Sequence, residues 1–436
     1  MKRVRSGLGW NVSSSLAGQF IGFVRSVTLA RLLVPEDFGL FTMALTIVAA
    51  ANALTTIGLD RTIIASKFET RAELKLQLDT VWSAELIRSF IVALLVSLSA
   101  FPTARFYGQT QLKFIIPVLA CANLVQGLQN IGLVLLRKEI SFGRIFWFEL
   151  ATNLAGVALT IALAALLHNV WALVFGMLVT TALGTVLSYV FHPYRPGLKF
   201  DRVALRRVVD FGKFALVVAV ASYVTNMADN IIVGRLLGAA ALGNYSLAFN
   251  IASAPIVIVI FSASAVLLPA YAEINSQDPA RLAPAFTKAF NLTLLIMLAI
   301  ALPFFLFAEQ IVRLLFGSRW TTAGSVLGIL ALVIPLRGLT QITSTVFWSA
   351  NRPGAAALTR TLDAIVFVVA LYPLTAAFGL RGVAWAGFIA YAFASLNRVV
   401  ALNKIIPGIA AKLLRVLLPT LLALTIMLLV RALTSR

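Results

Sequence analysis

Three arginines stand inside long apolar stretches of this 436-residue chain: Arg25, Arg88 and Arg337. If these stretches cross a membrane, each charge lies at a depth where it costs several kcal/mol, so each needs a partner or a water-filled surrounding. Arginine suits a phosphate group, because its planar fork donates two hydrogen bonds and keeps its charge when partly buried. We therefore predict that the three side chains line a central cavity and bind an anionic group.

Arg25 lies some 16 residues into an apolar stretch at 9–33, which is roughly 24 Å from the start of a helix at 1.5 Å per residue. That depth is too great for its side chain to reach the near membrane surface. Arg88 has a second interpretation: Glu85 precedes it by three residues, so the two side chains share one helix face and can neutralise each other.

Two carboxylates also fall inside apolar stretches. Asp229 follows Arg25 by 204 residues, an offset that recurs in the repeat described below, so opposite charges occupy matched places. Two roles stay open for Asp229: an ion pair with an arginine across the cavity, or the binding of a coupling cation or proton. Glu149 is a second candidate of the same kind. Arg360 with Asp363, and Arg398, fall near predicted helix ends, where we expect them to anchor the chain at the interface.

The sequence offers little for enzyme chemistry. It has one cysteine, Cys121, and two histidines, so neither a disulfide framework nor a metal cluster is expected. Phosphate-binding loops, dinucleotide fingerprints and Ser/His/Asp arrangements do not stand out. We expect no cofactor, no metal and no catalytic residue.

The composition explains where these charges sit. The chain is 60% hydrophobic and 12% charged, whereas soluble domains have about 45–50% apolar and about 25% charged residues. Apolar stretches of about 20 residues can cross the bilayer as helices. We expect such helices near 9–33, 38–62, 79–102, 112–135, 146–167, 171–191, 211–237, 242–269, 285–308, 323–349, 357–378, 381–403 and 411–430. Turn residues separate them, such as Pro35, Gly238 and Gly379.

A repeated motif divides the chain. Arg31-Leu32-Leu33 followed by Phe38-Gly39-Leu40-Phe41 returns 204 residues later as Arg235-Leu236-Leu237 followed by Leu242-Gly243-Asn244-Tyr245. A fixed-period echo of this kind indicates a duplicated unit, and duplicated halves are typical of transporters. Because Arg31 and Arg235 end their helices, we interpret both as structural.

Lysine and arginine set the orientation. The net charge is +20, and most basic residues fall in loops that share one side when the N-terminus is cytoplasmic. The prediction is an all-α integral membrane protein of two parallel six-helix bundles, related by a pseudo-twofold axis along the membrane normal, plus a C-terminal thirteenth helix. The predicted domains are 1–191, a cytoplasmic linker at 192–210 with an amphipathic helix, 211–404, and an extra helix in 405–436. A simple positively charged anchor explains the linker equally well. The thirteenth helix either spans the bilayer fully or lies at its periphery.

Several segments resemble one family. The segment Leu32-Leu33-Val34-Pro35-Glu36-Asp37-Phe38-Gly39 is similar to the end of the first helix in Wzx-type polysaccharide repeat-unit flippases, the lipopolysaccharide biosynthesis proteins of the multidrug/oligosaccharidyl-lipid/polysaccharide exporter superfamily. Other segments resemble the same family in the same order: Ala104-Arg105-Phe106-Tyr107-Gly108, Leu136-Arg137-Lys138-Glu139-Ile140, Tyr194-Arg195-Pro196, and Val312-Arg313-Leu314-Leu315-Phe316-Gly317. The odd number of predicted helices departs from the 12 or 14 usual in these proteins.

The resemblance implies a flippase that moves an undecaprenyl-pyrophosphate-linked oligosaccharide across the bacterial inner membrane by alternating access, for polysaccharide export. The implied partners are this lipid-linked oligosaccharide, membrane lipids and other polysaccharide assembly proteins, with no nucleic acid. Arg25 resembles in position a cavity arginine of related lipid flippases.

Three alternatives stay open. An ion-coupled multidrug exporter of the same superfamily predicts acidic cavity residues, which Asp229 favours and the three arginines oppose. An integral-membrane glycan polymerase or transferase needs long outer loops, which this span assignment does not provide. A non-catalytic scaffold for polysaccharide assembly leaves the internal charges unexplained.

Overall fold

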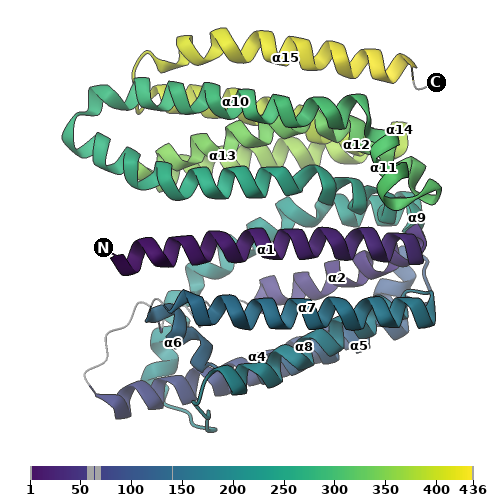
Figure 1. The fold of residues 1–436 in the computed structure, drawn as a ribbon, viewed down its shortest axis with the longest axis vertical. Helices are drawn as coiled ribbons and strands as arrows, with labels where there is room; N and C mark the ends of the chain where they lie inside the picture. Colours follow the sequence, from purple (N-terminus) through teal and green to yellow (C-terminus); the bar gives the residue numbers. More distant parts are fainter. Residues whose placement is uncertain (1, 56–62, 64–69, 140, 435–436) are drawn as a thin grey trace. The chain divides into compact units, whose positions relative to one another are not determined.

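A computed structural model describes residues 2–55, 63, 70–139 and 141–434. Within this part of the chain every regular element is helical (Figure 1). Internal contacts divide the chain into unit 1, Met1–Gly243, and unit 2, Asn244–Arg436. This division reflects which residues contact each other and does not test whether the two halves of the chain arose by duplication. The predicted domain boundaries therefore stay a prediction.

Unit 1 is built from long helices and shorter connecting ones. They are α1 (Lys2–Leu32), α2 (Pro35–Thr55), α4 (Arg71–Tyr107), α5 (Leu112–Gly127), α6 (Gly132–Lys138), α7 (Phe142–Leu167), α8 (Trp171–Phe191) and the part of α9 (Arg202–Gln277) up to Gly243. α7 packs against both α1 and α8, and α5 packs against α4. Figure 1 shows α1 and α7 running side by side.

Unit 2 holds the rest of α9 and the helices that follow it. They are α10 (Leu282–Leu306), α11 (Ala308–Phe316), α12 (Thr321–Ala331), α13 (Val333–Ser349), α14 (Pro353–Asn403) and α15 (Ile409–Thr434), with 3₁₀ turns at Pro279–Arg281 and Ser318–Trp320. α13 packs against α10 and α14, and α15 packs against α14.

The helices have the length and composition of membrane spans. Within the described residues, 8 helices are long and apolar enough to cross a bilayer, or up to 10 if each of two bent helix pairs forms one span. Two of these helices, α9 and α14, each cover two predicted spans and are broken by a glycine with positive φ, at Gly238 (84°) and Gly379 (58°). α1, which carries Ser13, Ser14, Ser15 and Arg25, is not among them. The chain is an all-helical, multi-pass membrane protein.

The structure confirms most predicted breaks and adds two bends. α1 ends before Pro35, and α14 starts at Pro353, because proline fits the first turn of a helix but not its interior. The predicted span at 112–135 is bent, since α5 and α6 meet at an angle of 62°, and it counts as one span only if the two helices are taken together. The predicted span at 323–349 is also broken, where α12 and α13 meet at 47°.

The antiparallel pair α7 and α8 is held by glycine–threonine contacts. A Cβ atom added at Gly156 would lie 2.5 Å from Thr180, and one added at Gly176 would lie 2.6 Å from Thr160. Both threonine hydroxyls donate to a carbonyl one turn earlier, so they leave no unpaired donor at the contact. Small residues at four-residue spacing let two helices approach closely where water supplies no hydrophobic driving force.

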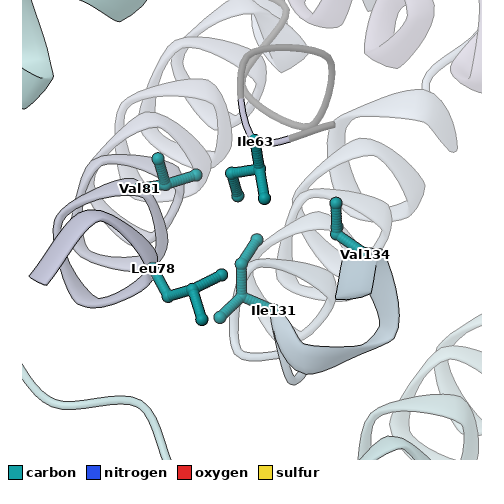
Figure 2. Packing of buried hydrophobic residues seen from close by; sticks show 5 residues of the cluster. All are labelled: Ile63, Leu78, Val81, Ile131 and Val134. Atoms are coloured by element: carbon teal, nitrogen blue, oxygen red, sulfur yellow. The ribbon is translucent and has the colours of Figure 1, made fainter. Parts of the chain in front are cut away.

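A compact apolar cluster fixes the end of α4 against α6. Ile63, Leu78, Val81, Ile131 and Val134 are all buried and pack together (Figure 2). Leu78 and Val81 lie three residues apart on α4, so both point toward the same neighbour.

The two copies of the repeated motif contact each other inside unit 1. A Cβ atom added at Gly39 would lie 1.8 Å from the carbonyl oxygen of Ala239, and one added at Gly243 would lie 1.8 Å from that of Pro35. The 204-residue offset relates Gly39 to Gly243 and Pro35 to Ala239, so the exchange is symmetric. Only glycine lets the two backbones approach this closely.

An extended segment at 192–201 is hydrogen-bonded to α4. Asp79 is buried, and its Oδ1 accepts the Tyr194 hydroxyl at 2.5 Å and the Gly197 backbone N–H at 2.9 Å. Further along, the backbone N–H of Lys199 donates to Ser83 and that of Asp201 to Thr80. Burial, and then the hydrogen bond to Asp79, raise the pKa of Tyr194, so its hydroxyl stays a donor. The first half of the predicted linker is therefore fixed to unit 1, while the side chains of its second half lie outside the described residues.

Replacing Gly39 or Gly243 by alanine is expected to lower the stability of the protein. Each new methyl group overlaps a backbone carbonyl, and overpacking of this kind costs about 1–3 kcal/mol. The measurement is the Tm of the purified protein in detergent. Gly22→Ala is the control, because no neighbouring atom lies within 4 Å of the place its new Cβ atom would take. Equal Tm values for Gly39→Ala, Gly243→Ala and the wild type would contradict the close contact.

Replacing Asp79 by alanine is expected to release the 192–201 segment. Because it removes the acceptor of two hydrogen bonds, each worth about 0.5–1.5 kcal/mol, tryptic cleavage after Lys199 should become about tenfold faster. Ser83→Ala, which removes one hydrogen bond, should have a smaller effect. An unchanged cleavage rate in Asp79→Ala would show that other contacts hold the segment.

Candidate functional site

Arg88 lies in a polar network that joins α4 to α2. Its guanidinium forms a bidentate ion pair with Glu85 one turn earlier, in which Nε donates to Oε2 at 2.9 Å and Nη2 donates to Oε1. Its Nη1 donates to Asn52 Oδ1 at 3.1 Å and to Thr55 Oγ1 at 3.2 Å. Asn52 donates in turn to Asn123 on α5. This environment favours the structural interpretation of Arg88, because its charge is compensated within the same helix.

Arg337 has a different environment, within unit 2. Its Nη1 donates to Ser253 Oγ on α9 at 2.8 Å. The guanidinium also lies 5.0 Å from the ring centre of Phe249 and 5.6 Å from that of Tyr391 on α14. None of these partners is a carboxylate, and the described residues provide no ion pair for Arg337. Aromatic faces and one hydroxyl orient this cation but leave its charge uncompensated.

Arg25 is half-buried on α1, in unit 1. Across the described residues it makes no hydrogen bond and no ion pair, so it is not paired with Asp229. Asp229 is 5% exposed on α9, and its Oδ1 accepts the backbone N–H of Asn230 at 2.9 Å. The two roles considered for Asp229, an ion pair and ion coupling, stay predictions.

Glu149 on α7 adjoins two pockets of unit 1. Its Oε2 accepts the hydroxyl of Ser14 on α1 at 2.5 Å. One pocket has a volume of about 280 Å³ and is also lined by Trp10, Arg137 and Phe146. The other has about 230 Å³ and is lined mainly by amide and hydroxyl side chains of α5, α7 and α8. The sequence showed Glu149 as an isolated carboxylate, and only the packing of the helices reveals the two pockets beside it.

Asp363 and Arg398 form an ion pair inside the α14 hairpin. Arg398 Nη1 lies 2.6 Å from Asp363 Oδ2, and the two side chains are only 9% and 14% exposed. The two side chains are paired with each other because the turn at Gly379 brings them face to face, while their expected place at the membrane interface stays a prediction. Asn397 also donates to Asp363, at 3.4 Å. The 35-residue separation hides this pair in the sequence.

A search of the described residues finds no group of three or more His, Cys, Asp or Glu side chains that could hold a metal ion. Charged and uncharged polar side chains can still act as partners of a ligand. Such groups bind and position a ligand through charge and hydrogen bonds.

The family is decided by a match over residues 28–325 to the model of the polysaccharide biosynthesis protein family. This chain belongs to that family. The resemblance to Wzx-type flippases seen in the sequence is confirmed. A relative, the lipopolysaccharide biosynthesis protein WzxC of Escherichia coli (strain K12), is 28% identical over 336 residues, which cover 77% of this chain and 67% of WzxC.

Two solved structures share the fold. The lipid II flippase MurJ, in an inward closed conformation, has a TM-score of 0.73 at 14% identity, covering 98% of each chain. An inward-facing multidrug resistance MATE family transporter of the MOP superfamily has a TM-score of 0.68 at 19% identity, covering 90% of this chain and 95% of the transporter. At these identities the similarity establishes the fold of this polysaccharide biosynthesis protein.

The Glu85–Arg88 pair is expected to behave as one energetic unit. Glu85→Gln leaves the Arg88 charge without its carboxylate, and Arg88→Gln does the reverse, so each single change should lower the Tm. The double variant should recover part of the loss, with a coupling energy of about 0.5–3 kcal/mol. The measurement is a double-mutant cycle of thermal unfolding in detergent. Losses that simply add would show that the two side chains do not stabilise each other.

Proposed function

We propose that this protein flips an undecaprenyl-pyrophosphate-linked oligosaccharide from the inner to the outer leaflet of the bacterial inner membrane by alternating access. The proposal joins the family membership with the chemistry of the described residues. A pyrophosphate needs cationic hydrogen-bond donors, and Arg25 and Arg337 are half-buried cations on α1 and α13. The N-terminus is cytoplasmic in this proposal, as the distribution of Lys and Arg predicts.

The architecture proposed with it is two parallel six-helix bundles related by a pseudo-twofold axis along the membrane normal, with α15 as the thirteenth helix. The proposed domains are those expected from the sequence, at 1–191, 192–210, 211–404 and 405–436. The symmetric contact of Gly39 with Ala239 and of Gly243 with Pro35 supports such an axis, because a twofold exchanges equivalent residues.

One observation carries the proposal: Arg25 and Arg337 are half-buried, and neither has a carboxylate partner among the described residues. A cation that serves only the fold is expected to be paired, as Arg88 and Arg398 are. The unused charge of these two arginines suits an anionic ligand. We assign Arg88 a supporting role beside the cavity rather than direct contact with the pyrophosphate.

An ion-coupled multidrug exporter is the second candidate. The burial of Asp229 favours it, since cationic drugs need an acidic partner. Arg25 and Arg337 oppose it, because they repel a cation. No contact in the described structure favours the polymerase, transferase or scaffold alternatives, and the proposed function includes no catalytic step. Polysaccharide assembly proteins remain proposed partners.

Arginine-to-alanine changes at Arg25 and Arg337 are expected to abolish complementation of a bacterium that lacks its own repeat-unit flippase. A hydrogen bond to a charged group is worth about 1.5–3 kcal/mol, so surface polysaccharide should fall about 10–100-fold. The readout is surface polymer at equal membrane abundance of each protein.

The matched control is Arg105→Ala, which removes an exposed arginine that lies over the ring of Phe101. This variant should complement like the wild type. If Arg25→Ala and Arg337→Ala both complement, the two arginines have a structural role. Failure of the wild-type protein, together with drug efflux in a parallel assay, would favour the multidrug exporter.

A further inference from the structure

The two pockets that share Glu149 differ from the arginine sites in charge. The larger pocket contains Arg137 and Glu149, which balance each other without forming an ion pair. Among the described residues that line the smaller pocket, Glu149 is the only charged one. Neither pocket therefore suits a strongly anionic ligand, because such a ligand needs an excess of positive charge.

The smaller pocket is lined by polar side chains with free hydrogen-bonding capacity. The side-chain amides of Gln126, Gln129 and Asn153 have no hydrogen-bond partner among the described residues, and the buried hydroxyl of Thr152 has none either. An amide offers two donors and one acceptor oxygen, and a hydroxyl both donates and accepts. Such groups match a ligand whose own hydroxyls donate and accept. Gln126 and Asn153 are exposed and Gln129 is half-buried, so these amides are accessible to a ligand.

The larger pocket adds flat apolar surfaces. The rings of Trp10 and Phe146 lie 5.2 Å apart, centre to centre, at an angle of 51°. Trp10 is 38% exposed, so part of its ring is available to a ligand. The C–H face of a sugar ring is apolar, while its rim carries hydroxyls, so an aromatic face beside polar groups suits it.

Glu149 connects the two pockets. A carboxylate has about four lone-pair sites, and Ser14 occupies one of them at 2.5 Å. The remaining sites can accept hydroxyl groups from both pockets. Volumes of about 280 and 230 Å³ lie just below the ~300–1,000 Å³ of pockets for drug-sized ligands. Each pocket therefore suits a small unit such as one ring.

We propose that these pockets form a carbohydrate-binding subsite of unit 1, in which two neighbouring uncharged sugar rings are joined by hydrogen bonds to Glu149. This inference rests on the proposed function and deepens it. Glu149 lies seven residues after the start of α7, about 10 Å along the helix at 1.5 Å per residue. The sequence places that end of α7 on the cytoplasmic side, so the subsite binds the glycan before transfer. A metal or alkali cation is a poorer occupant, since Glu149 is the one carboxylate among the residues that line the pockets.

The test compares three ligands on the full-length protein in lipid nanodiscs. The first is bare undecaprenyl pyrophosphate. The other two are the same lipid carrying a disaccharide, either of two hexoses or of two N-acetylhexosamines. The wild type should bind at least one disaccharide lipid about tenfold more tightly than the bare lipid, as a few net hydrogen bonds allow. Glu149→Gln and the isosteric Thr152→Val should each reduce this ratio toward one and leave the affinity for the bare lipid unchanged.

The control variant is Glu139→Gln, an exposed carboxylate outside both pockets, which should keep the wild-type ratio. Equal binding of all lipids by the wild type would overturn the carbohydrate subsite and leave the proposed function standing. A wild type that binds no lipid pyrophosphate would instead overturn the proposed function. The subsite would also be overturned if folded Glu149→Gln and Thr152→Val kept the wild-type ratio of affinity for the disaccharide lipid to affinity for the bare lipid. Folding of both variants is checked by Tm.

Discussion

The close contact between the two copies of the repeated motif constrains much of unit 1. At Gly39 and Gly243 the neighbouring backbone occupies the space that the Cβ atom of any other residue would need. Such an approach is possible only if both copies keep glycine, so one substitution separates the helices on both sides. The contact also explains why unit 1 extends to Gly243. The helix up to that residue packs on the first half of the chain, where the hydroxyl of Tyr223 donates to the carbonyl of Thr46 at 3.2 Å.

Charges in these apolar helices are accommodated in two ways. Arg88 and Arg398 each contact a carboxylate, at Glu85 and Asp363, and such pairs contribute little net stability while being costly to break. Arg337 contacts one hydroxyl and two aromatic rings instead. That arrangement holds the guanidinium in place without a carboxylate partner among the described residues. In the proposed function, this distinction separates arginines that serve the fold from those that bind the substrate.

The sequence predicts the elements better than it predicts their contacts. Hydrophobic length and turn residues place the helices and the breaks at Pro35, Gly238 and Gly379, since these depend on local chemistry. The bend between α12 and α13 lies just before Pro335 and Gly338, residues that favour a kink. The bend between α5 and α6 escapes prediction, because no proline lies between Gly127 and Gly132. The Asp363–Arg398 pair and the anchoring of the 192–201 segment by Asp79 also escape, since both join residues distant in sequence. For the candidate site, the types of residue and the Glu85–Arg88 pair were visible in the sequence, but the partners of Arg337 and Glu149 were not.

In the proposed function, charged and uncharged polar side chains bind different parts of the substrate. Every lipid-linked substrate of the proposed kind carries the same pyrophosphate, so arginines can recognise it without regard to the glycan. The sugars differ between substrates, and amides and hydroxyls can distinguish them through the geometry of individual hydrogen bonds. Each such bond contributes only about 0.5–1.5 kcal/mol net, because water competes for the same groups. Contacts of this strength select a glycan and still release it, whereas several buried ion pairs to the ligand would slow its departure. A transporter must release its ligand, and in the proposed function the smaller pocket of unit 1, lined mainly by amides and hydroxyls, meets that requirement while it selects the glycan.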